Sequence, residues 1–452
     1  MNLFGTDGIR GIANAGLSWR KAFKLGRVMG MELSPGKDLC VGKDTRASGD
    51  MLEASIIAGI TSAGRNVVRL GVVTTPGLSY LVKELQLGGG VMISASHNPA
   101  EYNGLKVFGP GGKKVPDQTE IRFSEFIEGP DDGNLFPTGR NIGRVVPGEA
   151  AVERYIDFLC RTPRNDLSGL RVVLDTANGS TSRIAPAVWG RLAGTVEVMN
   201  NSPDGTNINE KCGSTHPYAL AERMKQIRAG GTAFDAGFSY DGDGDRCIAV
   251  DETGAIQDGD HLMAVLALDM SGRGQLAGNV VVGTVMSNYG LEVGLRRHGL
   301  TLERTRVGDR YVLEKMEECG YKLGGEQSGH IIIRDRLWTG DGILTSLLVA
   351  DVMAATGKKL SELASVVASV PQRLVNVRTA DPQRLIGREP VLKAIKRAQA
   401  DLGERGRVLV RASGTEPVVR IMVECLDSDV LESCIQYLEG VVRRESEAAQ
   451  EG

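Results

Sequence analysis

Residues 90–99 read Gly90-Val91-Met92-Ile93-Ser94-Ala95-Ser96-His97-Asn98-Pro99. The first five are uncharged and mostly apolar, as in a strand that is buried on both faces. The Asn98-Pro99 pair then indicates a turn. Open α/β sheets bind their ligands just beyond the carboxyl ends of strands. This stretch therefore predicts a buried strand that presents Ser96, with an exposed hydroxyl, at the ligand-binding edge of an α/β sheet.

Strand-like and helix-like segments alternate on both sides of this stretch, which is typical of α/β domains. In the first part of the chain we expect helices over 17–33, 48–63 and 77–85 and strands over 39–42 and 67–70. Ser48 is the expected N-cap of the second helix. A similar order of elements restarts after a stretch rich in Gly, Pro and Asp near residues 129–147.

The second of these units has a helix at about 150–161 and strands over 171–174 and 237–240, and the third has a helix over 260–270 and strands over 280–285 and 321–323. From about residue 371 the pattern changes to two helices and several strands, which indicates a smaller α+β domain. We therefore predict three similar α/β domains over 1–148, 149–255 and 256–370, followed by an α+β domain over 371–452.

Length, charge and cysteine content narrow the class of protein. A chain of 452 residues exceeds a single hydrophobic core. Its 53 basic and 56 acidic residues give a net charge of −3, so no global field recruits nucleic acid or a membrane. Seven cysteines without a C-x-x-C pair indicate reduced thiols, and no apolar run approaches the roughly 20 residues of a membrane span. We expect a cytoplasmic protein.

The segment Asp241-Gly242-Asp243-Gly244-Asp245 spaces three carboxylates at every second position. Such a turn directs hard oxygen ligands at Mg²⁺ or Ca²⁺. An EF-hand would place Glu252 at its twelfth position, but Arg246 stands where that loop needs a glycine, and the flanking residues read as strands. Mg²⁺ that also contacts a phosphate oxygen therefore fits the loop better.

Two later loops have the polar groups that a sugar phosphate requires. Glu326, Ser328 and His330 lie between glycines and offer partners for sugar hydroxyls. A second loop offers an arginine, two hydroxyls and a glycine backbone to phosphate oxygens, through Arg411, Ser413, Gly414 and Thr415. We expect Arg420, in the following strand, to contact substrate as well. The spacing gives about one such loop per domain, so we expect a site where all four domains meet.

The pair Ser96-His97 also has an alternative interpretation as an acyl hydrolase. Adjacent residues on an extended segment point to opposite faces, however, and the chain shows no G-x-S-x-G around this serine. A polar turn without chemistry is the other alternative.

Taken as a set, these loops and the opening Gly5-Thr6-Asp7-Gly8-Ile9-Arg10-Gly11 resemble the α-D-phosphohexomutase superfamily over essentially the full length. The resemblance implies four domains, with the first three built on one α/β core around a mixed sheet. It also implies that Ser96 is an active phosphoserine. Mg²⁺ would then be held by the phosphoserine and by Asp241, Asp243 and Asp245.

The same resemblance assigns further roles. Arg10 and Lys106 match the basic residues near the transferring phosphate, and Arg246 matches the arginine that follows the metal loop. His330 matches a residue that assists proton transfer or contacts the substrate, and His97 is an expected substrate contact.

Within the superfamily, Ser94-Ala95-Ser96 and Glu326-Gln327-Ser328-Gly329-His330 are most similar to the phosphoglucosamine mutases. This implies interconversion of glucosamine 6-phosphate and glucosamine 1-phosphate through a 1,6-bisphosphate, with a hexosamine phosphate as substrate and the protein a monomer or homodimer. Gln327 and Ser328 are the residues expected to distinguish substituents at C2. The alternatives are a phosphomannomutase/phosphoglucomutase of broad specificity, a metal-dependent sugar phosphatase in which Asp241 attacks phosphate, and a non-catalytic sugar-phosphate sensor.

Overall fold

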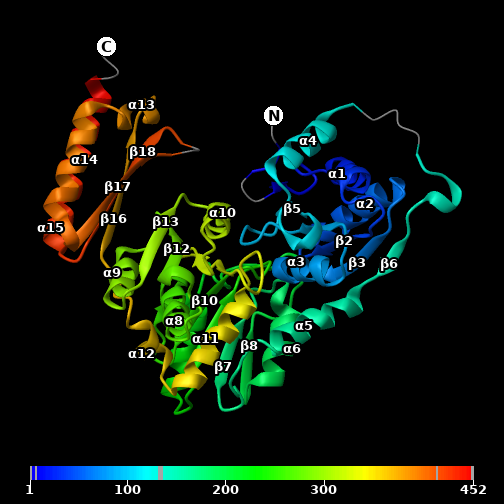
Figure 1. The fold of residues 1–452 in the computed structure, drawn as a ribbon, viewed down its shortest axis with the longest axis horizontal. Helices are drawn as coiled ribbons and strands as arrows, with labels where there is room; N and C mark the ends of the chain where they lie inside the picture. Colours follow the sequence, from blue (N-terminus) through cyan, green and yellow to red (C-terminus); the bar gives the residue numbers. More distant parts are fainter. Residues whose placement is uncertain (1–2, 6–7, 131–135, 414–415, 449–452) are drawn as a thin grey trace. The chain divides into compact units, whose positions relative to one another are not determined.

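The computed structural model describes residues 3–5, 8–130, 136–413 and 416–448 (Figure 1). The chain forms two compact units, Met1–Thr284 with Glu303–Ser365, and Val285–Leu302 with Val366–Gly452. Three sheets belong to the larger unit and one to the smaller. No helix within the described ranges is long and apolar enough to cross a bilayer.

The first sheet has six strands in the order β1-β5-β4-β2-β3-β6. β2 is parallel to β3 and β4, whereas β5 is antiparallel to β4 and β1, so the sheet is mixed. Its strands are β1 (Ile9–Ile12), β2 (Leu39–Lys43), β3 (Val67–Val72), β4 (Gly89–Ile93), β5 (Tyr102–Phe108) and β6 (Val145–Pro147). The helices of this domain are α1 (Trp19–Glu32), α2 (Ser48–Ser62), α3 (Thr75–Glu84) and α4 (Asp117–Glu128).

The second and third sheets repeat this mixed arrangement with fewer strands. The second, in the order β11-β10-β9-β7-β8, contains β7 (Arg171–Asp175), β8 (Thr195–Met199), β9 (Ala236–Tyr240), β10 (Cys247–Asp251) and β11 (Ile256–Gln257), with helices α5 (Val152–Cys160), α6 (Thr181–Leu192) and α7 (Tyr218–Ala229). The third, in the order β13-β12-β14-β15, contains β12 (Val280–Thr284), β13 (Thr301–Thr305), β14 (Leu323–Gly325) and β15 (Ile331–Ile333), with helices α8 (Gly259–Gly272), α10 (Asp309–Cys319), α11 (Gly342–Thr356) and α12 (Leu360–Ala364).

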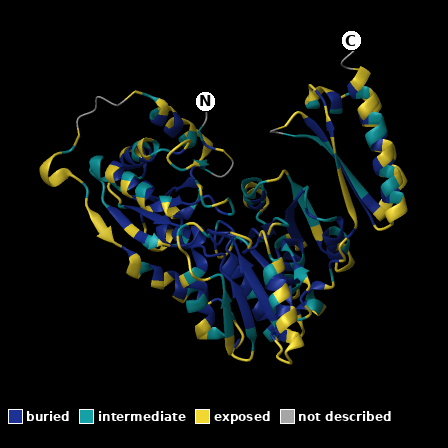
Figure 2. Ribbon diagram, turned by 180° about the vertical axis from the view of Figure 1, so that it is seen from behind, coloured by how far each residue is buried: buried dark blue, intermediate teal, exposed yellow. Residues whose placement is uncertain are grey.

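The smaller unit is built on an antiparallel sheet in the order β16-β18-β17. Its elements are α9 (Tyr289–Arg297), β16 (Gln372–Arg378), α13 (Pro382–Ile386), α14 (Glu389–Leu402), β17 (Gly406–Ala412), β18 (Val418–Cys425) and α15 (Ser428–Ala448). Val391, Ile421 and Leu438 belong to one buried apolar cluster between the sheet and its helices. The opposite faces of α14 and α15 are exposed (Figure 2).

The predicted fold class is confirmed: three mixed α/β sheets are followed by a smaller α+β domain. The predicted cap at Ser48 is wrong, because Ala47 is the N-cap residue and the Ser48 hydroxyl accepts a hydrogen bond from Asn103 Nδ2 at 2.9 Å. Strand β5 was not predicted, since Asn103-Gly104 is typical of a turn. Gly104 is needed within this strand because a Cβ there would overlap Ser94 O.

Helices α1 and α2 pack with their backbones in close contact. A Cβ on Gly26 would overlap Ile56 O, and one on Gly59 would overlap Phe23 O. This approach lets Leu25 and Ile56 join the buried core of the first domain. The two glycines therefore set the distance between the helices that cover the sheet.

We expect Gly59→Ala to destabilise the first domain although alanine is the better helix former. The propensity gain is about 1 kcal/mol, whereas overpacking a close contact costs about 1–3 kcal/mol. The midpoint of thermal unfolding, followed by circular dichroism, should fall. Gly190→Ala in α6 is the matched control, because a Cβ there meets no atom of the described residues within 4 Å. The midpoint of thermal unfolding of this variant should stay the same or rise. Equal responses of the two variants would contradict the packing argument.

Candidate active site

Ser96 follows β4 and lies inside the structure rather than on its surface. Its φ of +52° is in the left-handed region, and only 1% of its surface is exposed, so the expectation of an exposed hydroxyl is wrong. Its Oγ donates to Asp241 Oδ2 at 2.7 Å and lies 3.2 Å from His97 Nδ1. The argument that Ser96 and His97 point to opposite faces also fails, because a left-handed residue breaks the alternation of an extended strand.

The guanidinium of Arg46 holds the backbone that carries Ser96. Nη2 donates to Ser96 O at 2.9 Å and to Asn98 O at 2.8 Å, and Nη1 donates to Tyr102 O at 3.0 Å and to Pro99 O. Arg46 is 2% exposed, so these bonds form away from water, where they are strongest. Arg46 therefore fixes the backbone of the loop from Ser96 to Tyr102.

Two further buried side chains complete this support. Asp44 accepts from Arg46 Nε at 2.9 Å and from Ser94 Oγ at 2.5 Å, and Asn209 of the second domain donates through Nδ2 to Ser96 O at 2.8 Å. The sequence analysis missed Asp44, Arg46 and Asn209. For the first two a signal existed, since Asp44 and Arg46 follow the carboxyl end of β2 as Ser96 follows that of β4.

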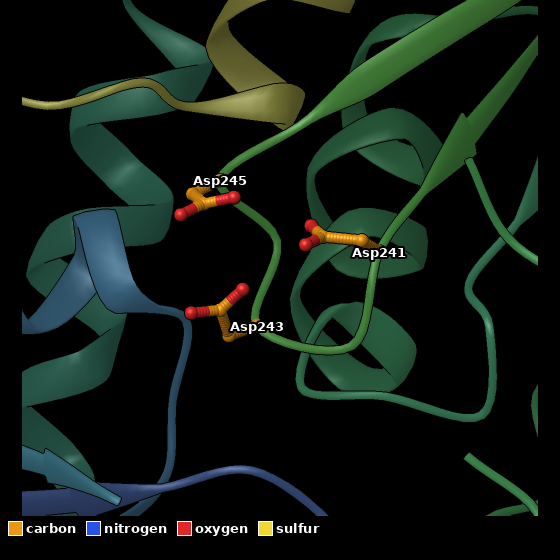
Figure 3. A group of neighbouring side chains, drawn as sticks. All are labelled: Asp241, Asp243 and Asp245. Carbon is orange, nitrogen blue, oxygen red and sulfur yellow. The ribbon is translucent and has the colours of Figure 1, made fainter. Parts of the chain in front are cut away.

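Asp241, Asp243 and Asp245 occupy the turn between β9 and β10, which are antiparallel neighbours. Figure 3 shows the three carboxylates turned toward a common space. One oxygen from each lies within 4.8 Å of the others, and all three residues are buried. Strands on both sides of the loop exclude the EF-hand alternative, which requires helices.

The carboxylate cluster is only partly compensated by its neighbours. Asp243 Oδ2 accepts from Thr75 Oγ1 at 2.5 Å and from Lys106 Nζ at 2.8 Å, and Lys106 Nζ is 3.7 Å from Asp245 Oδ2. Asp243 Oδ1 and Asp245 Oδ1 are buried and accept no hydrogen bond from any residue that the structure describes. Burial, followed by the charges of Asp245 and Asp243, raises the pKa of Asp241 well above its usual value. The cluster therefore fits a hard cation that would use the orphaned oxygens.

A pocket of about 480 Å³ adjoins this cluster within the larger unit. Arg10 and His97 of the first domain and Arg246 of the second supply basic side chains to its lining. Burial, and then the charges of Arg246 and Arg10, lower the pKa of His97 to about 4, so its ring is neutral at pH 7. Ser96 itself is not among the described lining residues, and its neighbours His97 and Asp245 are.

The loop between β14 and β15 supplies the third-domain wall of the pocket. Glu326 lines the pocket and accepts from Gly308 N at 3.0 Å. The amide of Gln327 instead donates to Asp258 Oδ2 at 3.0 Å, and Ser328 is exposed. Neither Gln327 nor Ser328 belongs to the described lining. The prediction that these two residues distinguish substituents at C2 of the sugar therefore gains no support.

His330, the last residue of this loop, joins the pocket to the carboxylate cluster. Nδ1 lies 3.5 Å from Asp245 Oδ2, and Nε2 accepts a hydrogen bond from Gly340 N at 3.0 Å. Burial lowers the pKa of His330, but Asp245 and Asp309 outweigh this and raise it to about 9. The hydrogen bond to Nε2 requires a neutral ring, with its proton on Nδ1 toward Asp245. A cation at the aspartates would favour the same form by compensating their charge.

The predicted phosphate-binding loop belongs to the smaller unit. Arg411 on β17 lies opposite Arg420 on β18, and Arg420 Nη2 binds Glu416 Oε2 at 2.7 Å. Ser413 Oγ accepts from Glu416 N at 3.3 Å. Burial, and then the neighbouring charge of Arg420, lower the pKa of Arg411, as expected where two cations are held together. Gly414 and Thr415 lie outside the described residues.

Comparison with known proteins places the chain in a family. Models of phosphoglucomutase/phosphomannomutase match it in order: α/β/α domain I over 1–131, domain II over 153–254, domain III over 258–370 and the C-terminal domain over 374–439. The chain therefore belongs to the phosphoglucomutase/phosphomannomutase family of phosphohexomutases. A family protein from Burkholderia thailandensis has the same fold, with a TM-score of 0.80 at 23% identity over 98% of this chain and 97% of that one.

The relatives that align over nearly the whole chain carry a more specific name. Phosphoglucosamine mutase of Moorella thermoacetica is 48% identical over 442 residues, 97% of this chain and 98% of the relative. Phosphoglucosamine mutase of Bacillus cereus is 45% identical over 445 residues, 98% of each. The fold is also shared with N-acetylphosphoglucosamine mutase of Aspergillus fumigatus, at a TM-score of 0.68 and 17% identity over 98% of this chain and 96% of that one.

We expect Arg46→Lys to loosen the Ser96 loop and to lower turnover about 10- to 100-fold, because an ammonium cannot reach all four carbonyl groups that the guanidinium holds. Hydrogen–deuterium exchange over residues 94–102 should become faster. Arg65→Lys is the matched control. Arg65 also binds backbone carbonyls, those of Gly30, Leu33, Ser34 and Lys37, but away from the pocket. If both variants lowered turnover equally, the effect would be general destabilisation.

Proposed function

We propose that this protein is a phosphoglucosamine mutase that interconverts glucosamine 6-phosphate and glucosamine 1-phosphate. The relatives of that name, at 45–48% identity over nearly the full length, support this substrate. The structural observation that carries the mechanism is the position of Ser96 Oγ, 2.7 Å from a carboxylate of the buried cluster. In this position a phosphoryl group on Ser96 meets both the cluster and the adjoining pocket.

The proposed reaction begins with phosphorylated Ser96. The Oγ–P bond breaks while a bond forms between phosphorus and the C1 oxygen of glucosamine 6-phosphate, and the hydroxyl proton passes to a basic side chain of the pocket. His330 is our candidate for this base, because it adjoins both the pocket and Asp245. It would take the proton at Nε2, which requires the hydrogen bond from Gly340 N to break. The 1,6-bisphosphate then turns round. The bond between its C6 oxygen and phosphorus breaks while Ser96 Oγ takes the phosphoryl group, and the base returns its proton to the C6 oxygen. The product is glucosamine 1-phosphate, and the enzyme is phosphorylated again.

Mg²⁺ is the proposed cofactor, held by the phosphoserine and by Asp241, Asp243 and Asp245. A phosphoserine carries a charge of about −1.5 to −2, so beside three carboxylates it requires compensation. When bound, the ion would polarise the phosphoryl oxygens and neutralise charge that develops during transfer. The Aspergillus fumigatus enzyme of the same fold is described in complex with GlcNAc-6P and magnesium, which agrees with this choice.

The remaining site residues divide between charge and recognition. Lys106, 2% exposed and bonded to Asp243, and Arg10, in the pocket lining, supply positive charge to the transferring group. His97 and Arg246, also in the lining, would contact the substrate. Glu326 would accept hydrogen bonds from sugar hydroxyls that all hexose phosphates share. Ser328, exposed at the same loop, stays a candidate contact from the sequence alone.

The phosphate that does not react would be bound by the smaller unit through Arg411, Ser413, Gly414, Thr415 and Arg420. A 1,6-bisphosphate has a phosphate at either end. A site that contacts only the phosphate can therefore bind the intermediate in both of its orientations. We also propose domains over 1–148, 149–255, 256–370 and 371–452, a monomer or homodimer, and a cytoplasmic location.

A metal-dependent phosphatase with Asp241 as nucleophile is less consistent with the geometry. Both oxygens of Asp241 are engaged, Oδ2 by Ser96 Oγ at 2.7 Å and Oδ1 by Arg246 N at 3.2 Å. An attacking carboxylate directs a lone pair at phosphorus, whereas both oxygens of Asp241 already accept a hydrogen bond from the protein.

The mutase proposal predicts a covalent phosphate on Ser96. Intact-mass spectrometry of the purified protein should show an adduct of about 80 Da that Ser96→Ala lacks, and this variant should lose mutase activity. Chelation of divalent ions should stop turnover and leave the adduct in place. Phosphate release that survives in Ser96→Ala would instead favour the phosphatase.

We further expect Arg411→Ala to lower kcat/KM about 10- to 150-fold, because one charge-assisted hydrogen bond to phosphate is worth about 1.5–3 kcal/mol. The mass adduct on Ser96 should persist, since the substitution lies in the smaller unit. Arg397→Ala, an exposed arginine of α14 in the same unit, is the control and should keep full activity. An unchanged kcat/KM in Arg411→Ala would show that this loop is only a surface turn.

A further inference from the structure

Asp309 lines the pocket, yet neither the carboxylate cluster nor the proposed phosphate contacts use it. It is the first residue of α10, and its side chain is 20% exposed. Among the described lining residues, carboxylates come from Asp245, Asp309 and Glu326. Asp245 belongs to the aspartate cluster that is proposed to hold the metal ion. Asp309 and Glu326 are therefore the two carboxylates left to meet an organic ligand.

Charge is divided between the walls of this pocket. The two arginines, Arg10 and Arg246, come from the first and second domains, whereas the two carboxylates outside the aspartate cluster, Asp309 and Glu326, come from the third. The two acidic residues are tied together, because Gly308 N, adjacent to Asp309, donates to Glu326 Oε1 at 3.0 Å. A ligand with one anionic end and one cationic group therefore has a preferred orientation here.

A 2-amino-2-deoxyhexose phosphate is such a ligand. It differs from a glucose phosphate only at C2, where an ammonium group, charged near neutral pH, replaces a hydroxyl. A carboxylate favours the ammonium group through a charge-assisted hydrogen bond. Gln327 cannot provide this selection in the observed geometry, since its amide is bonded to Asp258 outside the pocket lining.

We propose that Asp309 is the specificity-determining residue that binds the C2 ammonium group of the substrate. The inference rests on the proposed function and adds to it the side chain that makes the enzyme prefer glucosamine phosphate to glucose phosphate. Glu326 has a different task, because its Oε1 is fixed by Gly308 N and its remaining acceptor capacity suits hydroxyls common to both sugars.

A purely structural account of Asp309 also exists and predicts a different outcome. Asp309 Oδ2 is 2.7 Å from Lys114 Nζ of the first domain and 3.8 Å from Nε2 of His330, the candidate base, and Oδ1 accepts from Arg310 N at 2.8 Å. An acidic residue at a helix N-terminus is stabilising in its own right. If these contacts were its whole role, its loss would reduce activity on all sugars alike.

The test compares kcat/KM for glucosamine 6-phosphate and glucose 6-phosphate in the full-length enzyme. We expect Asp309→Asn to lower the ratio of the two values about 10- to 100-fold, chiefly through glucosamine 6-phosphate. Lys114→Gln is the matched control, because it breaks the same ion pair but keeps the carboxylate, and its ratio should hold or rise. An unchanged ratio in Asp309→Asn, whatever the loss of activity, overturns the proposal.

Two further arms keep the result interpretable. Asp309→Ser removes the charge with a smaller side chain and should lower the ratio in the same way if Asp309→Asn does not fold. N-acetylglucosamine 6-phosphate carries a neutral amide at C2, so its kcat/KM should not fall selectively in Asp309→Asn. A wild-type enzyme without preference for glucosamine 6-phosphate would reject the proposed substrate, whereas a wild-type preference that persists in both variants would reject only the role of Asp309.

Discussion

The repulsion among three buried carboxylates is the interaction on which the site depends. Asp241, Asp243 and Asp245 come within 4.8 Å of one another in a region closed to water, where like charges interact most strongly. Such a cluster persists if cations compensate its charge or if one carboxylate takes up a proton, as the raised pKa of Asp241 indicates. Lys106 supplies one positive charge from β5, and the two orphaned oxygens leave room for a metal ion. The geometry of Ser96 and of the pocket follows from this arrangement.

Compensation of the cluster requires the three domains of the larger unit at once. Thr75 and Lys106 reach Asp243 from the first domain, and His330 approaches Asp245 from the third. The loop itself belongs to the second domain. Groups from distant parts of the sequence therefore come within a few ångströms of one another. This explains why a protein of several similar domains can have one site instead of one per domain.

The sequence predicted the strand before Ser96, the hairpin that carries the aspartates and the change to an α+β domain near residue 371, because each has a strong local pattern. It did not predict β5 or the support from Arg46 and Asn209. Asn103-Gly104 is typical of a turn, and only the antiparallel neighbouring strands show that it belongs to a strand. A buried arginine that binds backbone carbonyl groups produces no periodic pattern in the sequence. Gln327 was expected to read the sugar, but its orientation depends on Asp258, which is far away in the sequence.

The burial of Ser96 has a consequence for how the proposed phosphate on this residue would be gained and lost. Kinases and phosphatases that act on proteins bind an exposed, extended segment around the target residue. Ser96 is instead left-handed and 1% exposed, and Arg46 and Asn209 both donate hydrogen bonds to its backbone oxygen. An enzyme of that kind would therefore have to open the loop that Arg46 holds before it reached this hydroxyl in the folded protein.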